Sequence, residues 1–150
     1  MRAVIQRVSQ ASVAVGGEGV AAIGPGMLVL LGVGKNDAES DAEYLADKIL
    51  QLRIFRNAAG EMDCSLAENP GLEILVVSQF TLFGDCRKGR RPSFTNAAGS
   101  ERACELYVHF TGCLAGSGAR VATGRFGAEM RVRLENDGPV TILLDSKKEF

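Results

Sequence analysis

Two short polar stretches of the chain carry residue types that could do chemistry. The first is Ser78-Gln79-Phe80-Thr81, which directly follows the apolar, β-branched run of residues 74–77. Such a run is typical of a strand buried on both faces, and its rigid end can hold hydroxyl, amide and backbone N–H groups against a ligand. Donors of this kind can stabilise the oxyanion that develops during ester hydrolysis. Taken alone, however, Ser and Thr at a strand end usually form turns, and this is the better interpretation of the stretch in isolation.

The second stretch covers residues 136–141, with the sequence Asn-Asp-Gly-Pro-Val-Thr. Asn, Asp, Gly and Pro are the residues that turns select, so residue type alone indicates a hairpin turn between the alternating segments 130–134 and 140–144. The isomer of the Gly138-Pro139 bond cannot be read from the dipeptide, because only about 5% of such bonds are cis in folded proteins.

A third feature is a group of four cations within five residues, namely Arg87, Lys88, Arg90 and Arg91. The chain as a whole has a net charge of −1, so this group is a local basic patch and not part of a generally basic surface. A local patch suits a polyanion that is contacted at one end. Residue by residue, a solvated surface loop is an equally good interpretation.

The usual catalytic and metal-binding patterns are missing from the sequence. His109 is the only histidine, and there is no Gly-x-Ser-x-Gly elbow and no His-Glu-x-x-His motif. The four cysteines lack paired spacing, and no glycine-rich segment has the spacing of a phosphate-binding loop. We therefore predict no metal and no cofactor. If the protein is an enzyme, its catalysis rests on positioning and on backbone donors.

Length and composition indicate one soluble globular domain over residues 1–150, with 46% hydrophobic and 23% charged residues. No apolar run reaches membrane-spanning length, and no signal peptide is apparent. Without a secretory signal, free thiols in a reducing compartment are the simplest account of the cysteines. We expect a cytoplasmic protein that does not contact a membrane.

The predicted elements follow the order strands, helix, strands, helix, strands. Residues 1–34 are typical of an antiparallel hairpin or meander. A helix follows, capped by Ser40 or Asp37, and residues 52–55 either continue it or begin a strand. Residues 62–66 form an edge strand or a loop. Residues at spacings of three and four build one apolar stripe along this first helix, namely Tyr44, Leu45, Lys48, Ile49 and Leu52.

A second helix begins after Thr95 or Asn96, either of which can cap it, and ends at residues 116–118. Its buried face carries Ala103, Leu106, Tyr107, Phe110 and Leu114. The order of elements suggests an α/β fold in which two main helices pack on one mixed, strongly twisted or barrel-like sheet.

Taken together, the two polar stretches resemble a known family. A strand ending in Ser-Gln-Phe-Thr-Leu at residues 78–82 and a late Asn-x-Gly-Pro-Val-Thr at residues 136–141 are similar to the paired signatures of the D-aminoacyl-tRNA deacylases. Residues 1–8 resemble the N-terminus of that family, and residues 84–94 resemble its basic loop. The resemblance covers essentially the whole chain.

The resemblance implies hydrolysis of the ester that joins a D-amino acid, or glycine, to the terminal adenosine of tRNA. The N–H groups near Phe80 and Thr81 would form the oxyanion site, while Ser78 and Gln79 would shape the adenosine and ester side. No side-chain nucleophile is implied, because the 2′-hydroxyl of the terminal ribose assists the attack. Arg87, Lys88, Arg90 and Arg91 would contact the tRNA.

The resemblance also implies a homodimer in which Gly138 and Pro139 act as the chiral filter, together with Asn136 of the same motif. Their peptide bond would be cis and would enter the active site of the partner subunit, excluding L substrates. Arg7 corresponds to the family arginine that orients this segment. Without the resemblance, the sequence favours the interpretation of Arg7 as a surface arginine on an edge strand.

Two other functions compete with the deacylase. One is a non-catalytic RNA-binding module that uses the basic loop. The other is a hydrolase of tRNA-linked esters with relaxed chirality.

Overall fold

The computed structural model describes residues 1–149. In chain order its elements are β1 (Arg2–Val15), β2 (Glu18–Ile23), β3 (Gly26–Gly32), α1 (Glu39–Leu50), β4 (Phe55–Arg56), β5 (Met62–Cys64), β6 (Glu73–Ser78), the 3-10 helix η1 (Phe80–Phe83), α2 (Ser100–Gly116), β7 (Arg120–Thr123) and β8 (Met130–Asp145).

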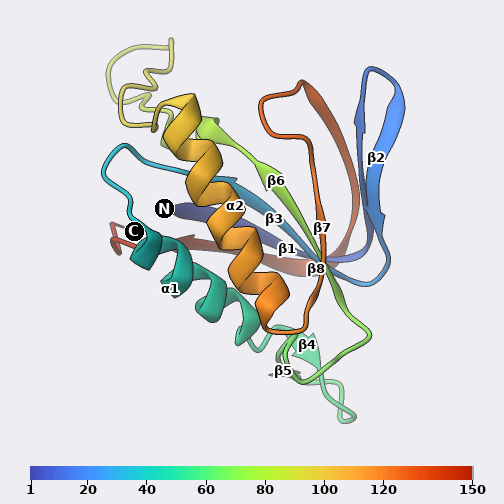
Figure 1. Cartoon of the computed structure of the whole chain (residues 1–150). Coiled ribbons are helices and arrows are strands. Elements are labelled where there is room, and N and C mark those ends of the chain that lie inside the picture. Colours follow the sequence, from blue (N-terminus) through green and yellow to red (C-terminus); the bar gives the residue numbers. More distant parts are fainter. Residues whose placement is uncertain (150) are drawn as a thin grey trace.

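Strand β1 organises the main sheet. The first half of β1 pairs antiparallel with β3 and its second half pairs antiparallel with β2, while β8 runs along its other edge. Beyond β3, strands β6 and β7 are added in parallel. The result is one mixed, nearly closed, barrel-like sheet, with α1 and α2 side by side over one face (Figure 1). The predicted fold class is confirmed.

The central strand β6 is buried on both faces, as its apolar run predicts. Ile74 and Val76 belong to the hydrophobic core between the sheet and the helices, which also contains Phe110 of α2. Leu75 and Val77 belong to a second cluster, formed inside the curved sheet with residues of β1, β2 and β3. Apolar contacts on both sides therefore fix the strand that leads to Ser78.

Helix α1 begins between the two residues that were expected to cap it. Its N-cap is Ala38, whose N–H donates to the Asp41 carboxylate at 2.9 Å. The Asp37 carboxylate instead accepts from the N–H of Gly34 at 2.6 Å, so neither Ser40 nor Asp37 is the cap. The helix ends at Leu50, and a short two-stranded ribbon of β4 and β5 follows.

Helix α2 begins later than expected, at Ser100 with Gly99 as its N-cap. Neither Thr95 nor Asn96 caps it, because the preceding segment is held by the chain after β3. The N–H of Ala98 donates to the Val33 oxygen at 2.9 Å, and the Asn96 oxygen accepts from Lys35 N–H at 3.0 Å. The predicted buried face is correct for Leu106, Tyr107, Phe110 and Leu114, whereas Ala103 is only half-buried.

The hairpin predicted at residues 136–141 is wrong, because β8 continues in one direction through it. Gln6 of β1 pairs with Thr141 and Val8 pairs with Asn136. The chain thus advances two residues along β1 and five along β8, and the excess residues of β8 bulge out of the ladder. Turn-forming residues therefore create a protrusion here, without reversing the chain.

Candidate active site

A cavity of about 640 Å³ lies where three segments meet. Its walls come from the end of β6 with the start of η1, from the first turns of α2, and from the connection between β7 and β8 together with the start of β8. Ser78, Gln79 and Phe80 line it, as do Met130 and Val132 from the inner side of β8. The cavity is therefore built at the stretch that the sequence singled out.

The local geometry explains why backbone donors are available here. Gln79 is still tied to the sheet, since its N–H donates to the Leu31 oxygen at 2.7 Å. The chain then turns into η1, in which Leu82 N–H bonds the Gln79 oxygen at 3.3 Å. Phe80 and Thr81 are the first two residues of η1, so their N–H groups have no acceptor within that helix.

Thr81 is exposed and lies beside the cavity without lining it. Its hydroxyl accepts a hydrogen bond from the Gln79 side-chain amide. An amide N–H cannot take up a proton, and within residues 1–149 no ionisable side chain hydrogen-bonds the Thr81 hydroxyl. A threonine nucleophile needs such a base, so this geometry suits a positioning role.

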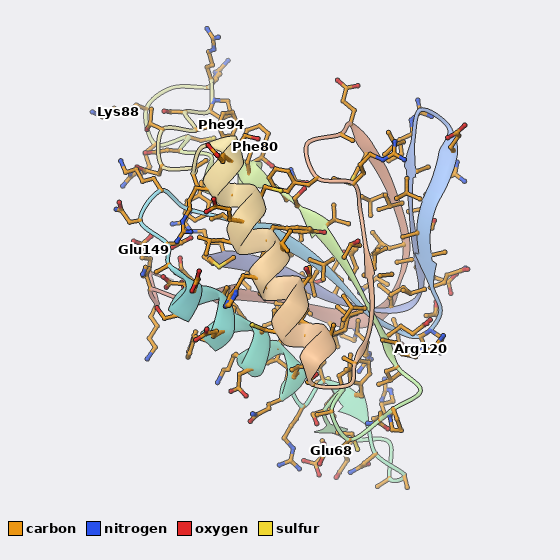
Figure 2. The ribbon with its side chains drawn as sticks, in the orientation of Figure 1. Glu68, Phe80, Lys88, Phe94, Arg120 and Glu149 are labelled. Atoms are coloured by element: carbon orange, nitrogen blue, oxygen red, sulfur yellow. The ribbon has the colours of Figure 1, made fainter. Side chains whose placement is uncertain are left out.

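Two aromatic rings stand at the rim of the cavity. Phe80 and Phe94 are packed edge to face, with ring centroids 5.1 Å apart and an interplanar angle of 70°. Both line the cavity, and Phe80 remains 58% exposed (Figure 2). An exposed ring of this kind can stack on a nucleobase.

Two further residues line the cavity, Tyr107 and Glu129, and the sequence does not predict either as a site residue. The Tyr107 hydroxyl donates to the Val76 oxygen at 2.9 Å, and burial raises its pKa to about 12, so Tyr107 is a wall residue and not an acid or base. Glu129 contributes an exposed carboxylate to the lining. No sequence signal distinguished it from other exposed acids.

Arg7 is buried, with only 2% of its surface exposed, so the interpretation as a surface arginine is wrong. Its Nε donates to the Asp137 backbone oxygen at 3.1 Å and lies 2.8 Å from the Asp137 carboxylate. Its Nη1 donates to the Ile54 oxygen. The arginine thus joins the base of the β8 bulge to the interior.

Asn136 fixes the bulge from its other side. Its side-chain amide donates to the Arg7 oxygen at 2.9 Å and to the Val140 oxygen at 3.1 Å, spanning the protrusion. Gly138 and Pro139 form the exposed tip, and their peptide bond is cis. Neither residue lines the cavity of its own chain. A single chain therefore does not bring the two polar stretches together.

The basic loop is exposed at all four cations, and Lys88 is at the periphery of the molecule (Figure 2). Arg87 already has a partner in the chain, because its guanidinium binds both Asp85 oxygens at 2.9 and 2.6 Å. Hydrogen bonds from this guanidinium and from the Arg87 N–H lower the pKa of Asp85 to about 2. The remaining three cations have no ion pair within residues 1–149.

Within the described part of the chain, no group of three or more His, Cys, Asp or Glu side chains is arranged to hold a metal. In that same part, no helix combines the length and apolar character needed to cross a membrane. His109 is half-buried on α2, with its Nε2 3.1 Å from Glu43 Oε1.

Comparison with known proteins decides the family. The model of the D-Tyr-tRNA(Tyr) deacylase family matches residues 4–145. The chain belongs to this family. The D-Tyr-tRNA(Tyr) deacylase match includes both polar stretches, the basic loop and Arg7.

Relatives of similar length support this membership. Proteins named D-aminoacyl-tRNA deacylase from Thermosipho melanesiensis and Koribacter versatilis are 58% and 59% identical, with both chains covered completely. The solved c-Myc DNA unwinding element binding protein is 44% identical with a TM-score of 0.91, over 97% of this chain and 98% of that one. A probable eukaryotic D-amino acid tRNA deacylase, 22% identical with a TM-score of 0.82 over 95% of this chain and 97% of that one, shares the fold.

Proposed function

We propose that this protein hydrolyses the ester of D-aminoacyl-tRNA, and of glycyl-tRNA, to release the amino acid and tRNA. The names of its relatives support the substrate class. The observation that carries the chemistry is the pair of N–H groups at Phe80 and Thr81, which lack an intrahelical acceptor beside the cavity. Such donors can stabilise the oxyanion of ester hydrolysis by about 2.7 to 4 kcal/mol each.

In this mechanism the protein supplies positioning and charge stabilisation, and the substrate supplies an activating group. The ester carbonyl lies against the Phe80 and Thr81 N–H groups, and Ser78 and Gln79 contact the adenosine side. The 2′-hydroxyl of the terminal ribose assists the attack of water. This division of labour accounts for a cavity whose only carboxylate, within the described residues, is exposed Glu129.

We further propose that the protein acts as a homodimer and that the Gly138-Pro139 tip enters the cavity of its partner. Three observations support this. The tip is exposed, it is anchored by Arg7 and Asn136, and large apolar side chains flank it on β8, with Leu134 39% and Leu143 59% exposed. Carbonyl oxygens at the tip would bind the α-amino group and leave no room for an L side chain. A pocket that excludes only L side chains accepts both D-amino acids and glycine.

Incubation with D-tyrosyl-tRNA and L-tyrosyl-tRNA, against spontaneous hydrolysis in buffer, tests the proposed function. Rapid release of tyrosine from the D form alone is expected. Release from neither, with tRNA still bound, would favour the RNA-binding module. Comparable release from both would favour a hydrolase with relaxed chirality.

A further inference from the structure

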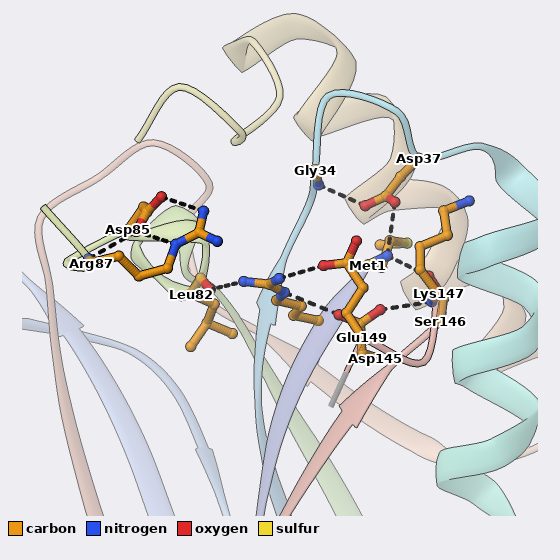
Figure 3. A network of polar contacts seen from close by, with 11 residues as sticks. Met1, Gly34, Asp37, Leu82, Asp85, Arg87, Asp145, Ser146, Lys147 and Glu149 are labelled. Atoms are coloured by element: carbon orange, nitrogen blue, oxygen red, sulfur yellow. Dashed lines mark hydrogen bonds and ion pairs between the residues drawn. The ribbon is translucent and has the colours of Figure 1, made fainter. Parts of the chain in front are cut away.

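Outside the cavity, Arg2 makes polar contacts with two distant segments of the chain. Figure 3 labels the residues that accept these hydrogen bonds, Leu82, Asp145 and Glu149. Its Nε donates to Asp145 Oδ2 at 3.1 Å and its Nη2 donates to Glu149 Oε2 at 2.7 Å, both near the end of the chain. Its Nη1 donates to the backbone oxygen of Leu82 at 3.1 Å. Leu82 belongs to η1, the turn that begins with Phe80 and Thr81.

We propose that Arg2 is a positioning residue for catalysis, which holds η1 so that the Phe80 and Thr81 N–H groups face the substrate ester. The inference rests on the proposed function, because it assigns those N–H groups to the oxyanion. It assigns Arg2 no contact with the substrate.

The turn η1 needs support from outside itself. It is only four residues long, none of its residues is fully buried, and its Leu82 to Gln79 hydrogen bond is long, at 3.3 Å. Short 3-10 helices have poorer hydrogen-bond geometry than α-helices, so they depend on their surroundings for a fixed conformation. A donor that holds a η1 carbonyl therefore controls the orientation of the whole turn.

Arg2 and the segment that follows β3 confine the end of η1 from two sides. The Arg2 guanidinium carbon lies 4.6 Å from the centre of the Phe83 ring. That ring also packs against Gly34 so closely that a Cβ atom there would lie 2.8 Å from it. Phe83 is thus confined by the glycine backbone and by a cation, and the Leu82 carbonyl beside it is bound by the same cation.

The arrangement uses properties that arginine has and lysine lacks. A guanidinium is planar and carries five N–H donors, so it can bind two carboxylates and a carbonyl at once while its face covers a ring. A lysine ammonium is a single point charge on a flexible stem. The Asp145 carboxylate accepts the hydrogen bond from Arg2 Nε and is itself fixed, because it also accepts a hydrogen bond from Lys147 N–H at 2.7 Å.

Arg2→Ala and Arg2→Lys test the inference, with Arg53→Ala as the matched control. Like Arg2, Arg53 donates to a backbone oxygen, that of Asp63 at 2.8 Å, and forms an ion pair with a carboxylate, that of Asp63 at 2.7 Å. These contacts lie at the β4–β5 ribbon and do not involve η1. Amide hydrogen exchange at Leu82 and Gly84 reports how firmly η1 is held. The rate of single-turnover release of D-tyrosine and the KM of D-tyrosyl-tRNA report the effect on catalysis. Thermal unfolding identifies any variant that fails to fold.

Both Arg2 variants are expected to exchange these amides about ten-fold faster or more, because local opening becomes easier. Release should slow by about ten-fold with KM nearly unchanged, because misplaced donors weaken the transition state more than binding. Arg53→Ala should change neither. If Arg2→Ala does not fold, Arg2→Lys, which keeps a cation beside Asp145, decides the question.

The inference is overturned if exchange or release in a folded Arg2 variant matches the wild type, or if Arg53→Ala has the same effect. Failure of the proposed function looks different, because the wild-type protein would then release no amino acid from D-tyrosyl-tRNA.

Discussion

The Nε atom of Arg7 lies 3.1 Å from the backbone oxygen of Asp137 and 2.8 Å from its carboxylate. Arg7 is buried, whereas Asp137 is at the base of an exposed tip. This pair therefore anchors a protruding part of the molecule to its interior, and Gly138 follows immediately. The orientation of the proposed chiral filter depends on this contact.

Arg7→Ala should lower the free energy of unfolding by about 2 to 4 kcal/mol, because it leaves a void and unpaired backbone oxygens at Asp137 and Ile54. Urea denaturation measures this loss. The control is Arg102→Ala, which removes an exposed ion pair with Glu105 and should change stability by less than about 1 kcal/mol. Equal effects of the two substitutions would show that the Arg7 contacts contribute little.

Gly138→Ala should leave the fold intact and impair D-specific hydrolysis. Within residues 1–149, the new methyl group would meet only the Asn136 side-chain oxygen, at 3.3 Å, a contact that a small shift of that side chain relieves. In the proposed complex this methyl group would lie between the backbone of residue 138 and the substrate, where glycine allows the two to approach closely. Stability and the D to L rate ratio should be measured together.

Gly112→Ala in α2 is the matched control for this substitution, because in the described part of the chain no atom beyond its own helix backbone and chain neighbours lies within 4 Å of the added Cβ. A Gly138→Ala protein as active and as D-specific as this control would mean that the tip does not approach the substrate.

Thr81→Ala should keep a large share of the hydrolysis rate. The Thr81 hydroxyl is bonded to the Gln79 amide and not to a base, so its removal takes away a positioning contact and no nucleophile. Single-turnover assays should also show that a tRNA with a terminal 2′-deoxyribose loses more rate than this variant does. A covalent aminoacyl adduct trapped on Thr81 would refute the expectation.

Replacing Arg87, Lys88, Arg90 and Arg91 by alanine should weaken tRNA binding and flatten its salt dependence. Each lost phosphate contact reduces the slope of log K against log salt by about 0.7 to 0.9. Because Arg87 already pairs with Asp85, Arg87→Ala alone should change the slope least. Binding titrations at several salt concentrations measure the slopes, and an unchanged slope in the quadruple variant would identify a solvated loop.

The sequence predicted the elements whose signals are local and repeated. The apolar run before Ser78 and the spacing of Leu106, Phe110 and Leu114 each indicate a buried face directly, and both predictions are confirmed. The helix starts were predicted wrongly, because several capping residues lie close together near each one. Contacts outside the helices select among them: the Asp37 carboxylate binds Gly34 N–H and the Met1 ammonium group, and Ala98 N–H donates to the Val33 oxygen.

Neither the bulge nor the partner of Arg7 could be predicted from local signals. Residues 136–139 show that the chain must bend, but only pairing with β1 determines that β8 continues beyond them. Arg7 follows the buried positions Ala3 and Ile5 in strand alternation, which places it inward without naming its partner. That partner, Asp137, is 130 residues away.

The most direct test of the account is the single-turnover release of D-tyrosine per chain, measured as the protein is diluted through dimer dissociation, with L-tyrosyl-tRNA in parallel. If the tip of one subunit completes the cavity of the other, release from the D form should fall with the fraction of dimer, and the L form should stay intact at high concentration. Release from the D form that is undiminished in the monomer, or equal release from both forms, would contradict the account.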